Sequence, residues 1–207
     1  MQSMPEKTVS TKDIYTGKVI TVKVSTVEIK DQKYSQREIV THPGGACVVA
    51  INESKKIILV RQFRKPIENY TIELPAGKLE SNEDPKNCIK RELHEETGYI
   101  SHDIKFIQSF YTSPGFSTER IYIYFAKVKE KNEPNPEDDE MIDVLEVSLN
   151  EALDMIKRNE ISDAKLASSE ILSDITHGKP EAFASIRENG KPSKRDGKTN
   201  ISIALRY

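Results

Sequence analysis

The chain of 207 residues has no tryptophan, two cysteines and no apolar run long enough to cross a membrane. Its first eleven residues are polar and lack the apolar centre of a signal peptide. Cys47 and Cys88 stand in apolar or helical patterns without metal-like spacing, which favours buried reduced thiols, a disulfide between them being the alternative. We therefore expect a cytoplasmic protein with no membrane partner.

An excess of charge of either sign is also lacking. Lysine and arginine number 31 against 33 acidic residues, a formal net charge of −2. Without a broad basic field, nucleic acid is not an expected partner. The length and the hydrophobic share of 36% are sufficient for one domain with a proper core, or for one domain with an appendage. Binding partners must therefore be inferred from local sites.

The N-terminal part has the pattern of a small β unit. Apolar residues alternate with polar ones over residues 17–30, with a one-residue slip in phase between Val24 and Val27, which predicts a bulged strand. Residues 34–42 follow a polar turn and can return as the hairpin partner. A unit over residues 13–42 is too small to be stable alone, so we expect it to pack on the main domain or on a second copy.

The rest of the chain alternates short apolar strands with a few helices, which predicts an α+β or α/β sandwich of layers. We expect strands at 46–51, 57–61, 72–74, 104–111, 121–128 and 144–148, and helices at 85–97, 150–158 and 163–176. We divide the chain into an N-terminal β unit (1–43), a main domain (44–176) and a loose C-terminal tail (177–207), in which 201–205 could form a short strand.

The segment 77–99 is the most informative part of the sequence. Asp84 is suited to the N-cap of a helix, Pro85 to its first position, and Gly98 to the residue just past its end. The predicted helix is therefore bracketed at both ends.

Three carboxylates crowd one face of this helix near its C-terminal end, because Glu92, Glu95 and Glu96 stand at i, i+3 and i+4. Their mutual repulsion and the helix dipole are both unfavourable there. Hard divalent ions, which prefer oxygen ligands, are the natural compensation, and Arg91 is placed to hold one carboxylate. The alternative is a solvent-facing charged helix, which is the commoner explanation for an isolated Arg-Glu-x-x-Glu-Glu run.

The full spacing resembles the Nudix box, Gly-x5-Glu-x7-Arg-Glu-U-x-Glu-Glu-x-Gly-U, in which U is a bulky aliphatic residue. Tyr99 departs from the usual aliphatic residue at the last position. Eight positions match the pattern: Gly77, Glu83, Arg91, Glu92, Leu93, Glu95, Glu96 and Gly98.

The resemblance implies an α+β protein with a Nudix α/β/α sandwich around a mixed central sheet, preceded by a small antiparallel β unit. Glu92 and Glu96 would bind metal directly, Glu95 would bind metal or accept a proton, and the backbone carbonyl of Ala76 would be a further ligand. The expected cofactor is Mg²⁺, with Mn²⁺ as the alternative. Such ions bridge diphosphate oxygens and lower the pKa of an attacking water.

The segment Tyr-Thr-Ser-Pro-Gly-Phe-Ser-Thr-Glu at 111–119 resembles the ADP-ribose pyrophosphatase subgroup. By this resemblance Pro114, Gly115 and Phe116 contact the substrate, and Glu119 binds its terminal ribose. Arg64, after an apolar strand, would pair with a phosphate, or would simply be a surface arginine.

Further residues are assigned by the same resemblance. Arg37 and Glu38 would reach a nucleotide across a swapped homodimer, and Glu140 would supply the catalytic base or a late metal contact. The alternative for Glu140 is a solvated acidic loop. Tyr15 and Tyr34 are candidates for contact with the adenine, or for packing against the sheet.

The sequence thus predicts Mg²⁺-dependent hydrolysis of the pyrophosphate bond of ADP-ribose to AMP and ribose 5-phosphate. Two alternatives stay open. One is hydrolysis of another nucleoside diphosphate sugar or dinucleotide, and the other is a Nudix domain that senses a nucleotide without catalysis.

Overall fold

The structure, a computed structural model, describes residues 5–30, 32–136 and 140–167. The expected C-terminal tail and most of the expected helix at 163–176 lie outside these residues. The described elements, in chain order, are β1 (Lys7–Thr16), β2 (Thr21–Lys30), β3 (Lys33–Thr41), β4 (Gly45–Asn52), β5 (Lys56–Arg64), η1 (Lys65–Ile67), β6 (Asn69–Glu73), β7 (Ala76–Lys78), α1 (Pro85–Thr97), β8 (Tyr99–Ile100), β9 (Ile104–Tyr111), β10 (Arg120–Val128), β11 (Glu130–Lys131), β12 (Ile142–Ser148), α2 (Leu149–Lys157) and α3 (Ala164–Ala167).

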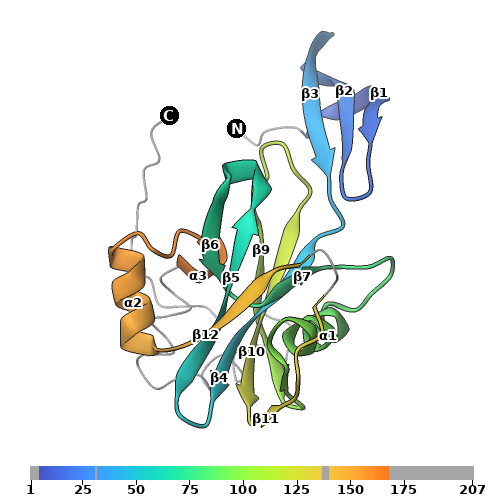
Figure 1. The fold of residues 1–207 in the computed structure, drawn as a ribbon. Coiled ribbons are helices and arrows are strands. Elements are labelled where there is room, and N and C mark those ends of the chain that lie inside the picture. The colour runs from blue at the N-terminus through green and yellow to red at the C-terminus, as the bar shows by residue number, and fades with distance from the viewer. Residues whose placement is uncertain (1–4, 31, 137–139, 168–207) are drawn as a thin grey trace, which may run out of the picture.

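Strands β1, β2 and β3 form a separate antiparallel sheet that stands away from the main body (Figure 1). All ten residues of β1 are exposed, so its sequence has no buried side from which the strand could be predicted. Strand β2 is bulged, but not between Val24 and Val27 as expected. Its register with β3 runs unbroken from Thr21 to Glu28 and shifts between Glu28 and Lys30. Near the predicted position the register with β1 also shifts, between Thr8 and Ser10 opposite Val27 and Thr26, but there the extra residue is in β1.

The central sheet has seven strands. Its main path is β12-β5-β4-β10-β9, with β6 added beside β5 and β7 beside β4. Strands β4 and β10 run parallel, whereas the other pairs in this sheet are antiparallel, so the sheet is mixed as expected. Strand β7 was not predicted, because three residues are too few to show an alternating pattern.

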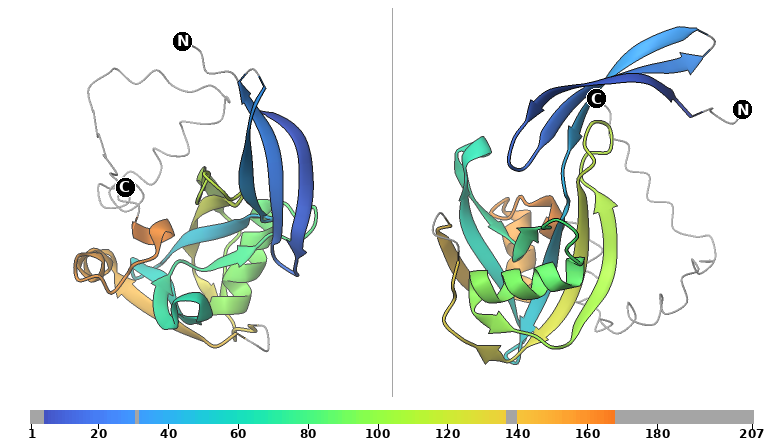
Figure 2. Two further views of the ribbon diagram at one scale, coloured as in Figure 1. Left: turned by 90° about the horizontal axis from the view of Figure 1, so that it is seen from above. Right: turned by 90° about the vertical axis from the view of Figure 1, so that its right-hand side faces the viewer.

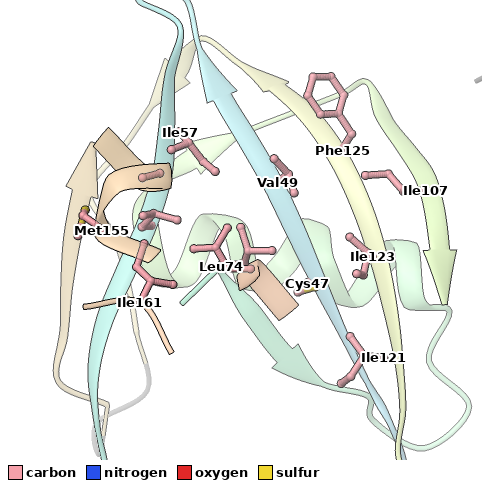
Figure 3. Packing of buried hydrophobic residues seen from close by; sticks show 13 residues of the cluster. Cys47, Val49, Ile57, Leu74, Ile107, Ile121, Ile123, Phe125, Met155 and Ile161 are labelled. Atoms are coloured by element: carbon pink, nitrogen blue, oxygen red, sulfur yellow. The ribbon is translucent and has the colours of Figure 1, made fainter. Parts of the chain in front are cut away.

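Strand β4 supplies both faces of this sheet. Ala46, Val48 and Ala50 belong to the hydrophobic cluster under α1, while Cys47 and Val49 belong to the cluster under α2 and α3 (Figure 3). Successive strand residues point to opposite faces, so this one strand, buried from Gly45 to Ala50, contributes to two layers. The views from above and from the side show α1 on one face of the sheet and α2 on the other (Figure 2). The sandwich of layers is confirmed.

None of the helices in the described ranges is both long and apolar enough to cross a membrane.

Candidate active site

Helix α1 begins and ends where the sequence predicts. The carboxylate of Asp84 accepts a hydrogen bond from the backbone N–H of Lys86 at 2.9 Å. Gly98 follows the helix with φ of 75°, and its N–H donates to the carbonyl of His94 at 2.8 Å. Leu93 is fully buried against the sheet, which fixes the rotation of the helix. The caps and this packing aim the glutamates of its other side at β7.

Two of these glutamates touch the backbone of β7. Glu96 is 3% exposed, and its Oε2 accepts a hydrogen bond from the N–H of Ala76 at 3.0 Å. Glu92 crosses the backbone at Gly77 so closely that a Cβ on residue 77 would lie 1.8 Å from its Oε1. The glycine of the motif is therefore required by the path of a glutamate side chain.

Arg91 contacts three carboxylates, where the sequence led us to expect one. Its Nη1 lies 2.9 Å from Glu92 Oε1 and 2.9 Å from Glu95 Oε2, and its Nε lies 3.5 Å from Glu83 Oε1. A planar guanidinium with five donors suits such a position. Arg91 therefore links the loop before α1 to two glutamates of the helix.

Burial, with repulsion between neighbouring carboxylates, disfavours the charged forms of Glu92 and Glu96. Burial raises the pKa of Glu92 to about 6; Arg91 opposes this shift, while the charges of Glu95 and Glu140 add to it. Burial also raises the pKa of Glu96 well above its usual range. The hydrogen bond from the Ala76 N–H lowers this pKa, whereas the charges of Glu92 and Glu140 raise it further. Repulsion among buried carboxylates is what a divalent cation would remove.

The donor chemistry fits a hard ion, since the residues present offer oxygen ligands. Across residues 5–30, 32–136 and 140–167, however, no three acidic, histidine or cysteine side chains are gathered around one point. Glu95 contacts Arg91, and Glu96 accepts from the Ala76 amide. Glu92 and Glu96 thus both lie against the backbone of β7, where their oxygens and the carbonyl of Ala76 are the candidate ligands.

A pocket of about 440 Å³ lies beside these groups. It contains six of the residues that the sequence assigned to the site: Arg64, Ala76, Arg91, Glu92, Glu119 and Glu140. Other described residues of its wall were not singled out beforehand, among them Val19, His42, Gln62, Glu80 and Lys165. The assigned residues outside this wall are Arg37, Glu38, Glu95, Glu96, Pro114, Gly115 and Phe116.

Arg64 is held by a carboxylate that the sequence analysis left without a role. Its Nε and Nη2 donate to Glu73 at 2.7 and 2.9 Å, and Thr71 adds a hydrogen bond to the same carboxylate at 2.5 Å. Burial raises the pKa of Glu73, but the hydrogen bond from Arg64, the charge of Lys165 and the bond from Thr71 outweigh it and bring the pKa to about 2. One edge of the guanidinium expected to bind phosphate therefore faces Glu73.

The loop that carries Glu119 is tied to the N-terminal sheet. The N–H of Val40 donates to the carbonyl of Phe116 at 2.7 Å, and the N–H of Thr118 donates to the carbonyl of Val40 at 2.9 Å. Pro114, Gly115 and Phe116 are exposed at the tip of this loop. The tie brings the end of β3 next to the pocket.

His42 follows β3 and lies next to Glu119. Its Nδ1 accepts the N–H of Gly44 at 3.0 Å and lies 3.6 Å from Glu119 Oε1, while Glu119 Oε2 accepts from Thr112 at 2.6 Å. Glu119 is therefore held by Thr112.

The remaining predicted residues lie on the N-terminal sheet, outside the pocket wall. Arg37 binds Glu6 through Nε and Nη2 at 3.0 and 2.5 Å, and Glu38 is exposed beside it. Tyr15 and Tyr34 are 57% and 56% exposed, so neither is buried against the sheet of its own chain.

Sequence reasoning missed His42, Glu73 and Lys165. A polar residue next to the Pro-Gly-Gly break was the available signal for His42, and the run Glu-Leu-Pro-Ala-Gly before the box was the signal for Glu73. Lys165 had no signal, because it stands in a segment that was read as an ordinary helix.

Comparison with known proteins agrees with this geometry. The NUDIX domain family matches residues 41–168. A relative from Bacillus subtilis (strain 168), an ADP-ribose pyrophosphatase, is 45% identical over 171 residues, which cover 81% of this chain and 91% of the relative. A methanol dehydrogenase activator from Bacillus methanolicus is 46% identical over 162 residues, covering 77% and 88%. A GDP-mannose pyrophosphatase from Enterobacter sp. (strain 638) is 36% identical over 140 residues, covering 63% and 73%.

A solved structure of an ADP compounds hydrolase superposes with a TM-score of 0.76 over 87% of this chain and 98% of that one, at 17% identity, a likeness of fold. The chain is thus a layered sandwich in which a capped helix turns glutamates toward a pocket that arginine and lysine also line. The chain belongs to the NUDIX domain family, and the resemblance seen in the sequence is confirmed.

Proposed function

We propose that the chain hydrolyses the pyrophosphate bond of ADP-ribose, giving AMP and ribose 5-phosphate, with Mg²⁺ as its cofactor. One observation carries the proposal: Glu92, Arg64 and Glu119 face the same pocket. A carboxylate suited to a metal ion, a cation suited to phosphate and a carboxylate suited to sugar hydroxyls thus share one space. The 45% identity to an ADP-ribose pyrophosphatase, over 91% of that protein, supports the same substrate.

Each residue has a defined task in this reaction. Glu92, Glu96 and the carbonyl of Ala76 would hold the metal, which supplies charge neutralisation and a water of lowered pKa. One carboxylate, Glu140 or Glu95, would accept the proton of the attacking water. Positioning of the diphosphate and neutralisation of its charge are the main contributions of the protein in phosphoryl transfer.

The substrate is held at its two ends. Arg64 binds a phosphate through the guanidinium edge that does not face Glu73. Glu119 accepts hydrogen bonds from hydroxyls of the terminal ribose. The hydrogen bond from Thr112 helps to orient the Glu119 carboxylate for this. The loop residues Pro114, Gly115 and Phe116 would cover this end of the substrate.

A substrate panel tests the proposal. Purified protein is incubated with Mg²⁺ and, separately, with ADP-ribose, GDP-mannose, NADH, a dinucleoside polyphosphate and a nucleoside triphosphate, and the products are separated chromatographically. Selective release of AMP from ADP-ribose is the expected result. Preference for GDP-mannose would overturn the substrate and keep the chemistry. Tight binding of ADP-ribose without turnover would indicate a sensor.

We further propose that the protein is a homodimer in which the N-terminal sheet of one copy reaches the pocket of the other. All ten residues of β1 are exposed, and Arg37 and Glu38 lie outside the pocket wall of their own chain. An outer strand exposed on both faces is well suited to pack against a second copy. The buried free thiols Cys47 and Cys88 support a cytoplasmic location.

Complementation tests the shared site. In a swapped dimer each pocket combines Glu96 of one copy with Arg37 of the other, so Arg37→Ala and Glu96→Gln remove residues that different copies supply to the same pocket. When equal amounts of the two variants are mixed and exchange subunits, half of the dimers contain one copy of each. Each such dimer has one intact site of its two, so about a quarter of wild-type activity should return. A monomer by light scattering, or no recovery in the mixture, would exclude this arrangement.

A further inference from the structure

Lys165 is a partly buried cation that lines the pocket. It stands on α3, and the neighbouring Leu166 and Ile161 are 0% and 2% exposed in the core on that face of the sheet. Its side chain is 18% exposed, and it lines the pocket together with Arg64. The short helix is therefore fixed in place by packing, with one lysine directed to the pocket.

Lys165 and Arg64 share a single carboxylate oxygen. The Nζ of Lys165 lies 3.1 Å from Glu73 Oε2, and the Nη2 of Arg64 lies 2.9 Å from the same atom. Asp163 adds a second contact to Nζ at 2.8 Å. The two cationic nitrogens are consequently close neighbours on one side of the pocket.

Two neighbouring cations repel one another strongly where water is scarce, so the two carboxylates are needed to keep them together. Burial lowers the pKa of Lys165, but the charges of Asp163 and Glu73 outweigh this effect and raise it above its ordinary value. Lys165 is therefore charged at neutral pH. The pocket that these two cations line is also lined by the carboxylates of Glu92 and Glu140.

We propose that Lys165 is a substrate-binding residue that, beside Arg64, contacts the diphosphate of the nucleotide, with Glu73 as the residue that positions both cations. The inference rests on the proposed function for the identity of the ligand. A diphosphate presents two adjacent anionic groups, which two adjacent cations match. The competing reading is a salt bridge that does no more than anchor α3 to β6.

Equilibrium binding separates these readings without turnover. Titration calorimetry in EDTA measures the affinity for ADP-ribose, and adenosine serves as a probe without phosphate. Lys165→Met keeps the apolar stem and removes the charge, Lys165→Arg restores a cation, and Lys157→Met on α2 is the control. Lys157 is a lysine whose side chain is 74% exposed and is paired with Asp154.

Loss of a charged hydrogen bond typically weakens binding by about tenfold or more. We expect this loss for ADP-ribose in Lys165→Met, near-normal affinity in Lys165→Arg and Lys157→Met, and unchanged adenosine binding in every variant. Wild-type affinity of folded Lys165→Met for ADP-ribose would overturn the proposal. An equal loss of adenosine affinity would also overturn it, since that pattern indicates a structural role.

A neutral background covers the case in which Lys165→Met does not fold. Glu73→Gln and the double variant Glu73→Gln/Lys165→Met differ in one cation, and the double variant leaves no unpaired Glu73 charge. Weaker ADP-ribose binding by the double variant supports the proposal, and equal binding rejects it. Failure of the proposed function would instead appear as absence of hydrolysis by the wild-type protein, whichever way these affinities fall.

Discussion

Glu92 occupies the space in which a side chain of Gly77 would lie, since a Cβ on residue 77 would stand 1.9 Å from the carboxyl carbon of Glu92. The glycine and the glutamate of the motif are thus one structural unit, although 15 positions separate them in the sequence.

Gly77→Ala should displace the Glu92 carboxylate and leave the fold intact. A shift of about 1 Å in a catalytic group commonly costs about a hundredfold in rate, and we expect a loss of kcat/KM of that order. Glu130→Ala is the control, because Glu130 is an exposed residue of β11 that does not line the pocket. Steady-state kinetics measure the activity of each variant, and thermal melting measures its stability. Normal activity of Gly77→Ala would show that Glu92 does not need its observed position.

Glu96→Gln should abolish turnover, by at least about a thousandfold, because a neutral amide is a poor ligand for a divalent ion. The amide oxygen can still accept from the Ala76 N–H, and the desolvation of a buried anion disappears. The melting temperature should therefore stay the same or rise. A near-normal rate with Mg²⁺ would show that Glu96 is not a metal ligand.

Arg91→Ala should reduce activity by about ten- to a hundredfold, the effect usual for residues that orient metal ligands. Glu83, Glu92 and Glu95 all lose their shared partner in this variant. Arg91→Lys should recover part of the loss, because one ammonium cannot reproduce the three contacts of a guanidinium. Arg158→Ala at the C-cap of α2, which breaks two exposed ion pairs, is the control. Equal kinetics of the Arg91 and Arg158 variants would contradict the role.

Glu73→Gln should lower stability at neutral pH by ~3 kcal/mol, from the difference between a pKa of about 2 in the folded protein and the ordinary 4.5. A depressed pKa means that the stabilisation is present above pH 4.5 and is lost as the pH falls from there toward 2. Urea unfolding at pH 7 and at pH 2.5 measures this. The two proteins should differ clearly at pH 7 and little at pH 2.5; a constant difference would contradict the ion-pair network.

The acidic helix was predictable because its signals are local. Asp84 and Gly98 act on neighbouring backbone groups, and the spacing of Glu92 and Glu96 follows from the helical repeat. The contact between Lys165 and Glu73 joins residues 92 positions apart, so composition and periodicity contain no trace of it. Sequence reasoning located most of the carboxylates and Arg64 of the pocket and missed Lys165.

The N-terminal sheet shows the same limit. Strand β3 was expected, since residues such as Ile39 and Val40 give it an apolar pattern. Strand β1 has no buried position. It pairs with β2 through backbone hydrogen bonds, which leave no hydrophobic pattern in the sequence. The position of the bulge in β2 was wrong for a related reason: a slip in hydrophobic phase reports which face is buried, and both faces of β2 are partly covered.

Strand β4 divides its side chains between two hydrophobic clusters and also pairs Ala46 with Gly77. The register and length of β4 should therefore tolerate less change than the identity of any one of its residues. An insertion or deletion of one residue would move the side chains of each hydrophobic cluster to the other face of the sheet. It would also shift the pairing of Ala46 with Gly77 and so displace Gly77 relative to Glu92. Variation in β4 should accordingly consist of replacements among small and β-branched residues at constant length, while changes in length collect in the turns at its ends.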